Sequence, residues 1–117
     1  MTAKDAGWLF RALGDGTRLR ILAALLQRPV SFAELRRILR RPPSTLSRHL
    51  RYLETRGLVD WRHAGNTVIY RLTPADDPLH RKVLSFARSA ADFVDEVATD
   101  RAQLRRKPSK PKSRPQS

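Results

Sequence analysis

Apolar side chains recur every three or four residues between residues 5 and 56, a spacing typical of amphipathic helices. Start and stop signals divide this region into four helical segments. The first carries Trp8 and Leu9 on one face and stops at Gly14. Asp15 can cap a second helix, which Pro29 ends. The chain is therefore predicted to begin with two short helices that each bury one face.

The next two segments are joined by a pair of prolines. Residues Ser31–Glu34 read S-F-A-E, a capping box that opens a third helix, and Pro42 stops it. Pro43 suits the first turn of a fourth helix from about Ser44 to Thr55, closed by Gly57. Two helices joined by so short a turn have the proportions of a helix-turn-helix.

The hydrophobic period changes to about two from Leu58 to Leu72, which predicts a β-hairpin turning at Gly65 and Asn66. Pairing across that turn places one set of side chains on the inner face: Val59, Trp61, His63, Val68, Tyr70 and Leu72. The outer face receives Asp60, Arg62, Ile69 and Arg71. The hairpin is expected to have an aromatic inner face and an arginine-bearing outer face.

One long helix is expected from Leu79 to about Leu104. A heptad stripe runs along it through Leu79, Val83, Phe86, Ala90, Phe93 and Val97. A second stripe lies beside it through Leu84, Ala87, Ala91, Val94 and Ala98. Two adjacent stripes suit two partners, so this helix is predicted to form a dimer interface. Packing on its own domain alone is the simpler alternative.

Length and charge place further limits on the protein. A chain of 117 residues favours a single domain. The formal net charge is +13, which indicates a polyanionic partner. Residues 105–117 hold six cations, no acid and no apolar side chain, so a disordered basic tail is expected there. The domain of residues 1–104 keeps a net charge of +7, so it is basic without the tail.

Several classes of site and location are disfavoured by composition. The chain contains no cysteine, which excludes disulfides, thiolate metal sites and cysteine nucleophiles. The longest apolar run, residues 21–26, is too short to cross a membrane, so a cytosolic protein is expected. His49 is expected to pack at the edge of the core, His63 to stack near Trp61 or Val68, and His80 to lie at the surface. No histidine has a catalytic partner at a recognisable spacing, and the chain is not expected to be an enzyme.

The fourth helix separates apolar from polar side chains. Leu46, Leu50 and Leu53 share one side. The opposite side carries Ser44, Ser47, Arg48, Arg51 and Thr55. Arginine forks and small hydroxyls suit base edges and phosphates, so this side is predicted to read the major groove of duplex DNA. Arg62 and Arg71 of the hairpin are expected on flanking phosphates or in a minor groove.

Four successive stretches, LFRALGDGTRLRILAALL, SFAELRRIL, STLSRHLRYLETRGLV and HAGNTVIYRL, resemble the ArsR/SmtB family of bacterial winged-helix repressors. The resemblance covers about residues 6–72. It implies a mainly α fold with a β-hairpin wing, the winged helix-turn-helix, in a bacterial cytoplasmic protein that joins the nucleoid when bound to DNA. It also implies a homodimer that binds a near-palindromic operator and leaves it when an inducer binds.

The same resemblance assigns roles to individual positions. The base-reading positions are Ser44, Thr45, Ser47 and Arg48. The dimer forms through the first and last helices, and the residues expected in its interface are Trp8, Leu9, Leu79, Val83, Phe86, Ala90, Phe93 and Val97.

The metal sites of the family do not match this sequence. Ser31 and Ala33 replace the thiolate pair C-x-C of one branch. In the other branch's pattern, D-x-H-x10-H-x2-H, placing His80 at the first histidine leaves Ala91 and Val94 where nitrogen ligands are required. No metal and no cofactor is therefore expected. A small-molecule inducer remains possible but unidentified. An apolar pocket of Trp8, Phe10, Phe86 and Phe93 is one candidate site for it, and ordinary interface core is the alternative.

Two other functional classes remain open. The high charge and basic tail favour a sequence-nonspecific architectural DNA-binding protein, which would bind specific and random duplexes equally. The wide apolar last helix favours a winged-helix protein-interaction module, which would bind DNA weakly even at low salt. A role at a membrane surface is disfavoured, because the tail has no apolar side chain to insert.

Overall fold

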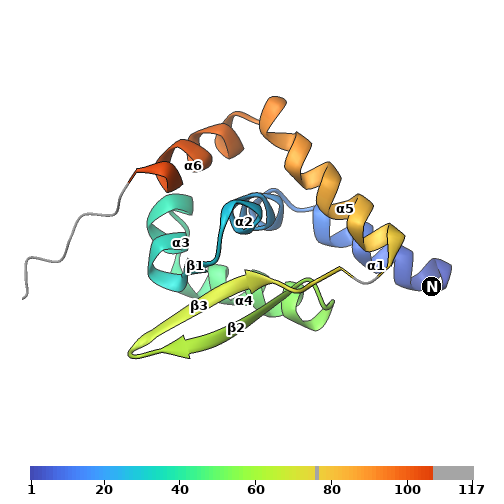
Figure 1. Cartoon of the computed structure of the whole chain (residues 1–117), viewed down its shortest axis with the longest axis horizontal. Coiled ribbons are helices and arrows are strands. Elements are labelled where there is room, and N and C mark those ends of the chain that lie inside the picture. The colour runs from blue at the N-terminus through green and yellow to red at the C-terminus, as the bar shows by residue number, and fades with distance from the viewer. Residues whose placement is uncertain (76, 107–117) are drawn as a thin grey trace, which may run out of the picture.

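The computed structural model describes residues 1–75 and 77–106. Its helices and strands follow one another around a central helix, α2, with the hairpin projecting to one side (Figure 1). In chain order they are α1 (Ala3–Leu13), α2 (Gly16–Gln27), β1 (Val30–Ser31), α3 (Phe32–Leu39), α4 (Pro43–Thr55), β2 (Val59–Ala64), β3 (Thr67–Leu72), α5 (Pro78–Ser89), the 3-10 turn η1 (Ala90–Asp92) and α6 (Asp95–Arg105). The predicted class, mainly α with a β-hairpin wing, is confirmed.

The predicted helix starts are explained by their caps. The Asp15 carboxylate accepts hydrogen bonds from the backbone N–H groups of Thr17 and Arg18, at 2.8 and 3.1 Å. The Ser31 hydroxyl accepts from the N–H of Glu34 at 3.1 Å, but the Glu34 carboxylate binds Arg28 at 2.7 Å. Only half of the predicted capping box therefore forms at α3, because an arginine binds its acid.

The hairpin has the predicted register, with Val59 opposite Leu72 and Trp61 opposite Tyr70. The structure adds a third strand that was not predicted. β1 pairs antiparallel with β3, so the order in the sheet is β1-β3-β2. A strand of two residues is too short to show an alternating pattern, and it ties the base of the wing to the start of α3.

The core lies between α2 and the helices around it. Ile21 and Leu22 of α2 are fully buried, and so is the predicted inner stripe of α4, Leu46, Leu50 and Leu53. One face of α4 is thus fixed against the core, and its other face is left for solvent or a partner.

The single long C-terminal helix predicted from the heptad stripe is wrong. The N–H groups of Phe93 and Val94 both donate to the carbonyl oxygen of Ala90 at 2.9 Å, and Val94 has an extended backbone that ends the helical run. After this bend α6 packs back on α2 and α3 (Figure 1). The side chains of the predicted heptad stripe are therefore divided, some lying in the interior of the chain and others at its surface.

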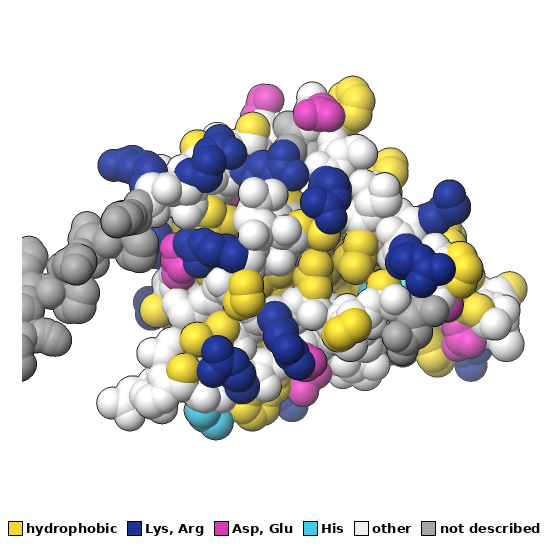
Figure 2. All heavy atoms as spheres, viewed as in Figure 1, with side chains coloured by type: hydrophobic (Ala, Val, Ile, Leu, Met, Phe, Trp, Pro, Cys, Tyr) yellow, Lys and Arg dark blue, Asp and Glu magenta, His cyan; other side chains and the backbone are white. Residues whose placement is uncertain are grey.

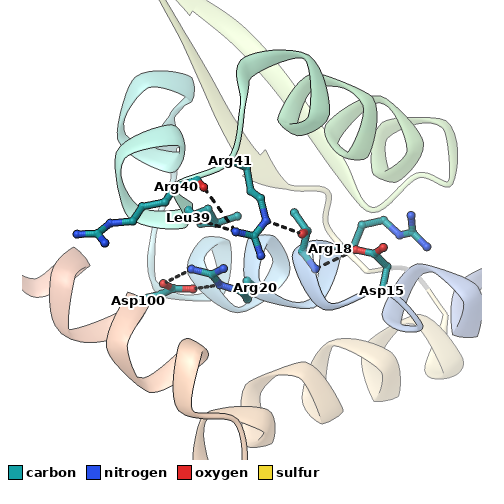
Figure 3. A network of polar contacts seen from close by, with 8 residues as sticks. Asp15, Arg18, Arg20, Leu39, Arg40, Arg41 and Asp100 are labelled. Carbon is teal, nitrogen blue, oxygen red and sulfur yellow. Dashed lines mark hydrogen bonds and ion pairs between the residues drawn. The ribbon is translucent and has the colours of Figure 1, made fainter.

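Polar contacts hold α6 in this position. The Arg20 guanidinium donates from Nε and Nη2 to the two oxygens of Asp100, at 2.8 and 2.9 Å. These side chains, drawn in Figure 3 between α2 and α6, are only 12% and 4% exposed. Arg28 also donates to the carbonyl oxygen of Leu104 at 3.2 Å. A buried ion pair thus joins the central helix to the last one.

The end of the chain departs slightly from its prediction. Arg105, expected to begin the tail, is the last residue of α6. The rest of the predicted tail, from residue 107 onward, lies outside the described residues. No helix in the described parts of the chain has the length and apolar character needed to cross a membrane.

Candidate nucleic-acid interface

The outward face of α4 carries the predicted reading residues at the surface. Ser44, Ser47, Arg48 and Arg51 are exposed, and Thr45 is half-buried. Within residues 1–75 and 77–106, neither arginine forms an ion pair. Their charges are therefore available to a polyanion.

More arginines lie on α3 and in the turn that leads to α4. Arg36, Arg37, Arg40 and Arg41 are all exposed. Figure 2 shows one side of the molecule, on which arginine and lysine side chains spread over both the helices and the wing, with fewer acids among them. The basic character of the sequence thus belongs to the folded part as well as to its C-terminal end.

The two wing arginines differ in their surroundings. Arg62 is exposed and has no ion pair with any described residue. Arg71 donates from Nε to Asp60 across the strands at 2.7 Å, and both side chains are exposed. The hydrogen bond to Asp60 raises the pKa of Arg71. A DNA contact by Arg71 must therefore compete with its carboxylate partner.

A groove of about 640 Å³ runs between α4 and the wing. Its lining includes Arg51 and Glu54 from α4 and Trp61 and Tyr70 from the hairpin. The Trp61 indole N–H donates to Glu54 Oε2 at 3.1 Å, and burial, with Glu54 nearby, raises the pKa of Tyr70. The phenol is thus a neutral donor beside the reading helix. Sequence reasoning missed Glu54, although it follows Ser47 by seven residues and so shares its face.

His49 lies behind the reading face, at the edge of the core as predicted. It is 8% exposed, and its Nδ1 is 3.3 Å from Arg18 Nη1 and 3.8 Å from Asp15 Oδ1. Burial lowers the pKa of His49, and the charge of Arg18 acts in the same direction against the opposing effect of Asp15. Burial would raise the pKa of Asp15, but the hydrogen bond from the Arg18 N–H and the charges of His49 and Arg18 lower it overall.

This pKa shift predicts a pH dependence of stability. The folded chain binds a proton at His49 less readily than the unfolded chain, whose histidine pKa is about 6.5. The contribution of His49 to stability is therefore full above pH 6.5 and is lost as the pH falls through the folded-state pKa. Urea unfolding at pH 7 and pH 5 is expected to show a smaller loss of stability in His49→Gln than in the parent. The exposed His63→Gln serves as control, and equal losses in all three proteins would contradict this assignment.

Stacked side chains connect α4 to α1 and α2. The Arg18 guanidinium lies 4.2 Å from the centre of the Tyr52 ring, and that of Arg56 lies 5.3 Å from the same ring. Arg56 also lies 4.2 Å from the centre of the Trp8 ring. Such contacts between cations and aromatic rings are worth about 0.5–2 kcal/mol each. Trp8, predicted in the dimer interface, is thus partly covered within its own chain.

The predicted dimer residues do not lie together. Leu9, Val83, Ala90 and Val97 are buried within the single chain. Phe86 and Leu79 line an apolar groove of about 450 Å³ between α1 and α5, together with Phe10, Leu13 and Val83. Phe93, 84% exposed at the bend before α6, and Trp8 are not part of this groove. The structure therefore unites part of the predicted interface and the predicted apolar pocket, centred on Phe10 and Phe86.

Comparison with known proteins identifies the family. The sequence model of a protein family, described as bacterial regulatory protein, arsR family, matches residues 15–60, which include α2 to α4 and the start of the wing. A transcriptional repressor SmtB homolog from Synechocystis is 32% identical over 80% of this chain and 67% of its own length. This chain belongs to the ArsR family. Its members are DNA-binding transcriptional regulators and not enzymes.

Further relatives of this ArsR-family chain agree in sequence and in fold. The regulator KmtR of Mycobacterium tuberculosis is 39% identical over 55% of this chain, and the match spans only about half, 49%, of KmtR. The structure of HlyU from Vibrio cholerae is 31% identical and covers 78% of this chain and 92% of its own, with a TM-score of 0.66. The repressor BigR from Xylella fastidiosa, 24% identical with a TM-score of 0.65, shares the fold.

Proposed function

We propose that the protein is a homodimeric transcriptional repressor that binds a near-palindromic operator, senses no metal through thiolates and responds to an inducer still to be identified. The observation that carries this proposal is the outward face of α4. It holds two arginines without ion pairs among the described residues, beside small hydroxyls and next to an arginine-bearing wing. Base edges and phosphates require such donors.

The reading helix supplies contacts of two kinds. Arg48 and Arg51 suit bidentate bonds to guanine or bonds to phosphate, and Ser44, Thr45 and Ser47 offer short donors near the start of α4. α4 starts without a side-chain cap because Pro42 has no acceptor in its side chain, which leaves the first turn open to a phosphate. The wing arginines flank the contact between α4 and the DNA. Arg62 binds a phosphate directly, and Arg71 does so when a phosphate replaces Asp60 as its partner.

Dimerisation is assigned to α1 and α5. The apolar groove between these helices and the exposed rings of Phe10 and Phe86 favour burial against a second copy. A two-fold dimer presents two α4 helices about 34 Å apart, which matches two half-sites one turn of DNA apart. A near-palindrome is the sequence that such a dimer requires.

Arg48→Ala is expected to weaken operator binding by about 1–3 kcal/mol and to alter base preference at one position of each half-site. The reason is the loss of a bidentate base contact. The measurement is a titration of the operator and of its single-base variants by fluorescence anisotropy. Arg88→Ala removes an exposed arginine from α5 and is the matched control. A loss of the same size on every duplex would assign Arg48 to phosphate contact alone.

The alternative function is sequence-nonspecific architectural DNA binding, which the spread of arginine and lysine side chains over the face seen in Figure 2 favours. A footprint and salt-series titration on DNA upstream of the protein's own gene, with a random duplex beside it, decides between the two. A protected near-palindrome bound about a thousandfold more tightly than random DNA supports the repressor. Equal affinity for both duplexes supports the architectural protein. The same titration is repeated with residues 1–106, which retain all of α6. The difference in DNA affinity from the full chain measures the contribution of the basic residues after position 106.

A further inference from the structure

A separate cavity, of about 240 Å³, lies where α1, the end of α4 and the start of α5 meet. Its lining includes Asp5, Trp8 and Leu9 from α1 and Arg56 from the end of α4. Asp77 and His80 line it from the start of α5. A water molecule occupies about 30 Å³ of liquid volume, so the cavity has room for a molecule of several non-hydrogen atoms.

Arg56 has no ionic partner among the described residues. Its guanidinium lies against the Trp8 ring at 4.2 Å and near the Tyr52 ring at 5.3 Å, measured to the ring centres. Its Nε is buried and donates no hydrogen bond. Stacking covers the faces of a guanidinium and leaves the donors at its edge, which is the arrangement that binds a carboxylate.

His80 is a second buried group without a partner. The sequence placed it at the surface, but it is 9% exposed because the start of α5 packs on α1, and its Nε2 has no hydrogen-bond partner in the described structure. Buried polar atoms left in this state are few in folded proteins and call for an explanation, such as a bound molecule. Arg56 and His80, from different helices, line the same cavity.

Two carboxylates complete the lining. Among the described residues, each carboxylate accepts a hydrogen bond at one of its two oxygens. Asp5 Oδ2 accepts from the Thr2 N–H at 3.2 Å, and Asp77 Oδ1 accepts from the His80 N–H at 2.9 Å. The bonds to Thr2 lower the pKa of Asp5, so this group is ionised at neutral pH. Arg56 and two carboxylates therefore share a cavity whose other walls include Met1, Trp8 and Leu9, and the positive charge of the Met1 α-ammonium group also acts on Asp5.

We propose that this cavity is a binding site for an amino acid. The ligand's carboxylate binds the edge of Arg56, its ammonium group binds Asp5 or Asp77, and its side chain lies against Leu9 and Trp8. A simple carboxylate would occupy Arg56 but bring no positive charge to the two aspartates, and a simple amine would leave Arg56 without an acceptor. A zwitterion pairs with Arg56 and with a carboxylate at once, and one of its ends also offers His80 Nε2 the hydrogen-bond partner that it lacks.

The position of this cavity gives the ligand a regulatory effect, a step that rests on the proposed function. Arg56 directly follows the reading helix, whereas Trp8 and His80 belong to the two helices assigned to the dimer. A ligand that joins them favours one orientation of α4 relative to α1 and α5. Coupling of this kind changes affinities by about 5- to 150-fold, and a tenfold change in operator affinity is the expected result.

Binding is tested on the full chain by nuclear magnetic resonance. The protein has two tryptophans, and the indole N–H signal of Trp8 reports on the cavity while that of Trp61 on the wing is an internal control. The probes are the twenty standard L-amino acids up to about 10 mM, tenfold above a millimolar dissociation constant. At least one of them is expected to move the Trp8 signal and leave the Trp61 signal unchanged. The proposal would be overturned if every active probe moved the Trp8 and Trp61 signals equally, or if no probe moved the Trp8 signal.

Ionic recognition is tested with analogues and variants. Two analogues of the binding amino acid, the deaminated acid and the decarboxylated amine, are each expected to bind the parent protein at least about tenfold more weakly. The amino acid itself is expected to bind Arg56→Lys at least about tenfold more weakly, because this variant keeps the charge but loses the guanidinium fork. Arg81→Lys, an exposed change on α5 outside the cavity, is the control. Thermal unfolding without ligand confirms that both variants fold. Undiminished binding by Arg56→Lys or by either analogue would overturn the assignment.

The regulatory step has its own measurement. The same amino acid is added to the protein–operator complex and the operator affinity is titrated. A change of about tenfold that Arg56→Lys abolishes supports coupling. An unchanged affinity despite a Trp8 shift overturns the regulatory effect. A protein that shows the Trp8 shift but binds no DNA would refute the proposed function and leave the amino-acid site intact.

Discussion

Asp100→Ala is expected to lower the free energy of unfolding by about 3 kcal/mol. The reason is that the substitution leaves the Arg20 guanidinium, 12% exposed, without the carboxylate that binds two of its nitrogens. An uncompensated buried charge costs more than the pair contributes. Urea unfolding of the parent and the variant at neutral pH measures the loss.

Two controls separate the effect of charge from that of packing. Asp60→Ala breaks the exposed pair with Arg71 and is expected to cost no more than about 1 kcal/mol. The double variant Arg20→Met, Asp100→Leu replaces both charges by apolar groups and is expected to recover most of the lost stability. If Asp100→Ala cost no more than Asp60→Ala, then the ion pair would not hold α6 on α2 as described.

Local patterns in the sequence determined much of the fold. Asp15 predicted the start of α2 because a short acceptor side chain satisfies the free N–H groups of the first turn. Gly65 predicted the hairpin register because its positive φ of 65° suits the tight turn between β2 and β3. The polar face of α4 followed from helical spacing alone. Each of these features depends on residues close together in the chain.

The features that were missed depend on distant contacts. No glycine or proline marks the bend between α5 and α6, and the apolar spacing continues across it, so periodicity predicted one helix. The bend places α6 against α2, where Asp100 meets Arg20 from 80 positions earlier in the chain. His80 and Arg56 likewise come to line one cavity only after α1, α4 and α5 have packed. No local pattern carries information of this kind.

Phe86→Asp is expected to convert the proposed dimer to a monomer and to lower operator affinity by more than about a hundredfold. Phe86 is 65% exposed on α5 and lines the apolar groove with Phe10, so a carboxylate there would be buried without a partner in the dimer but solvated in the monomer. A monomer retains one reading helix and loses the second half-site. Sedimentation velocity and operator titration measure the two effects.

Folding and dimerisation can be distinguished because the altered side chain is exposed in the single chain. The far-ultraviolet circular dichroism spectrum of the Phe86→Asp monomer should match that of Ala98→Asp, which adds the same charge at an exposed position on α6 and is expected to stay dimeric. The monomer should still unfold cooperatively, but at a lower temperature than the dimer, because association stabilises the folded state. Phe93→Asp extends the comparison to the bend, since the heptad stripe includes Phe93 but the groove does not. Loss of the dimer in Phe86→Asp alone would place the interface at the groove, and loss in both would extend it along the predicted stripe. A Phe86→Asp protein that remained dimeric and bound the operator normally would exclude α1 and α5 as the dimer interface, because a carboxylate cannot be tolerated in the centre of an apolar contact.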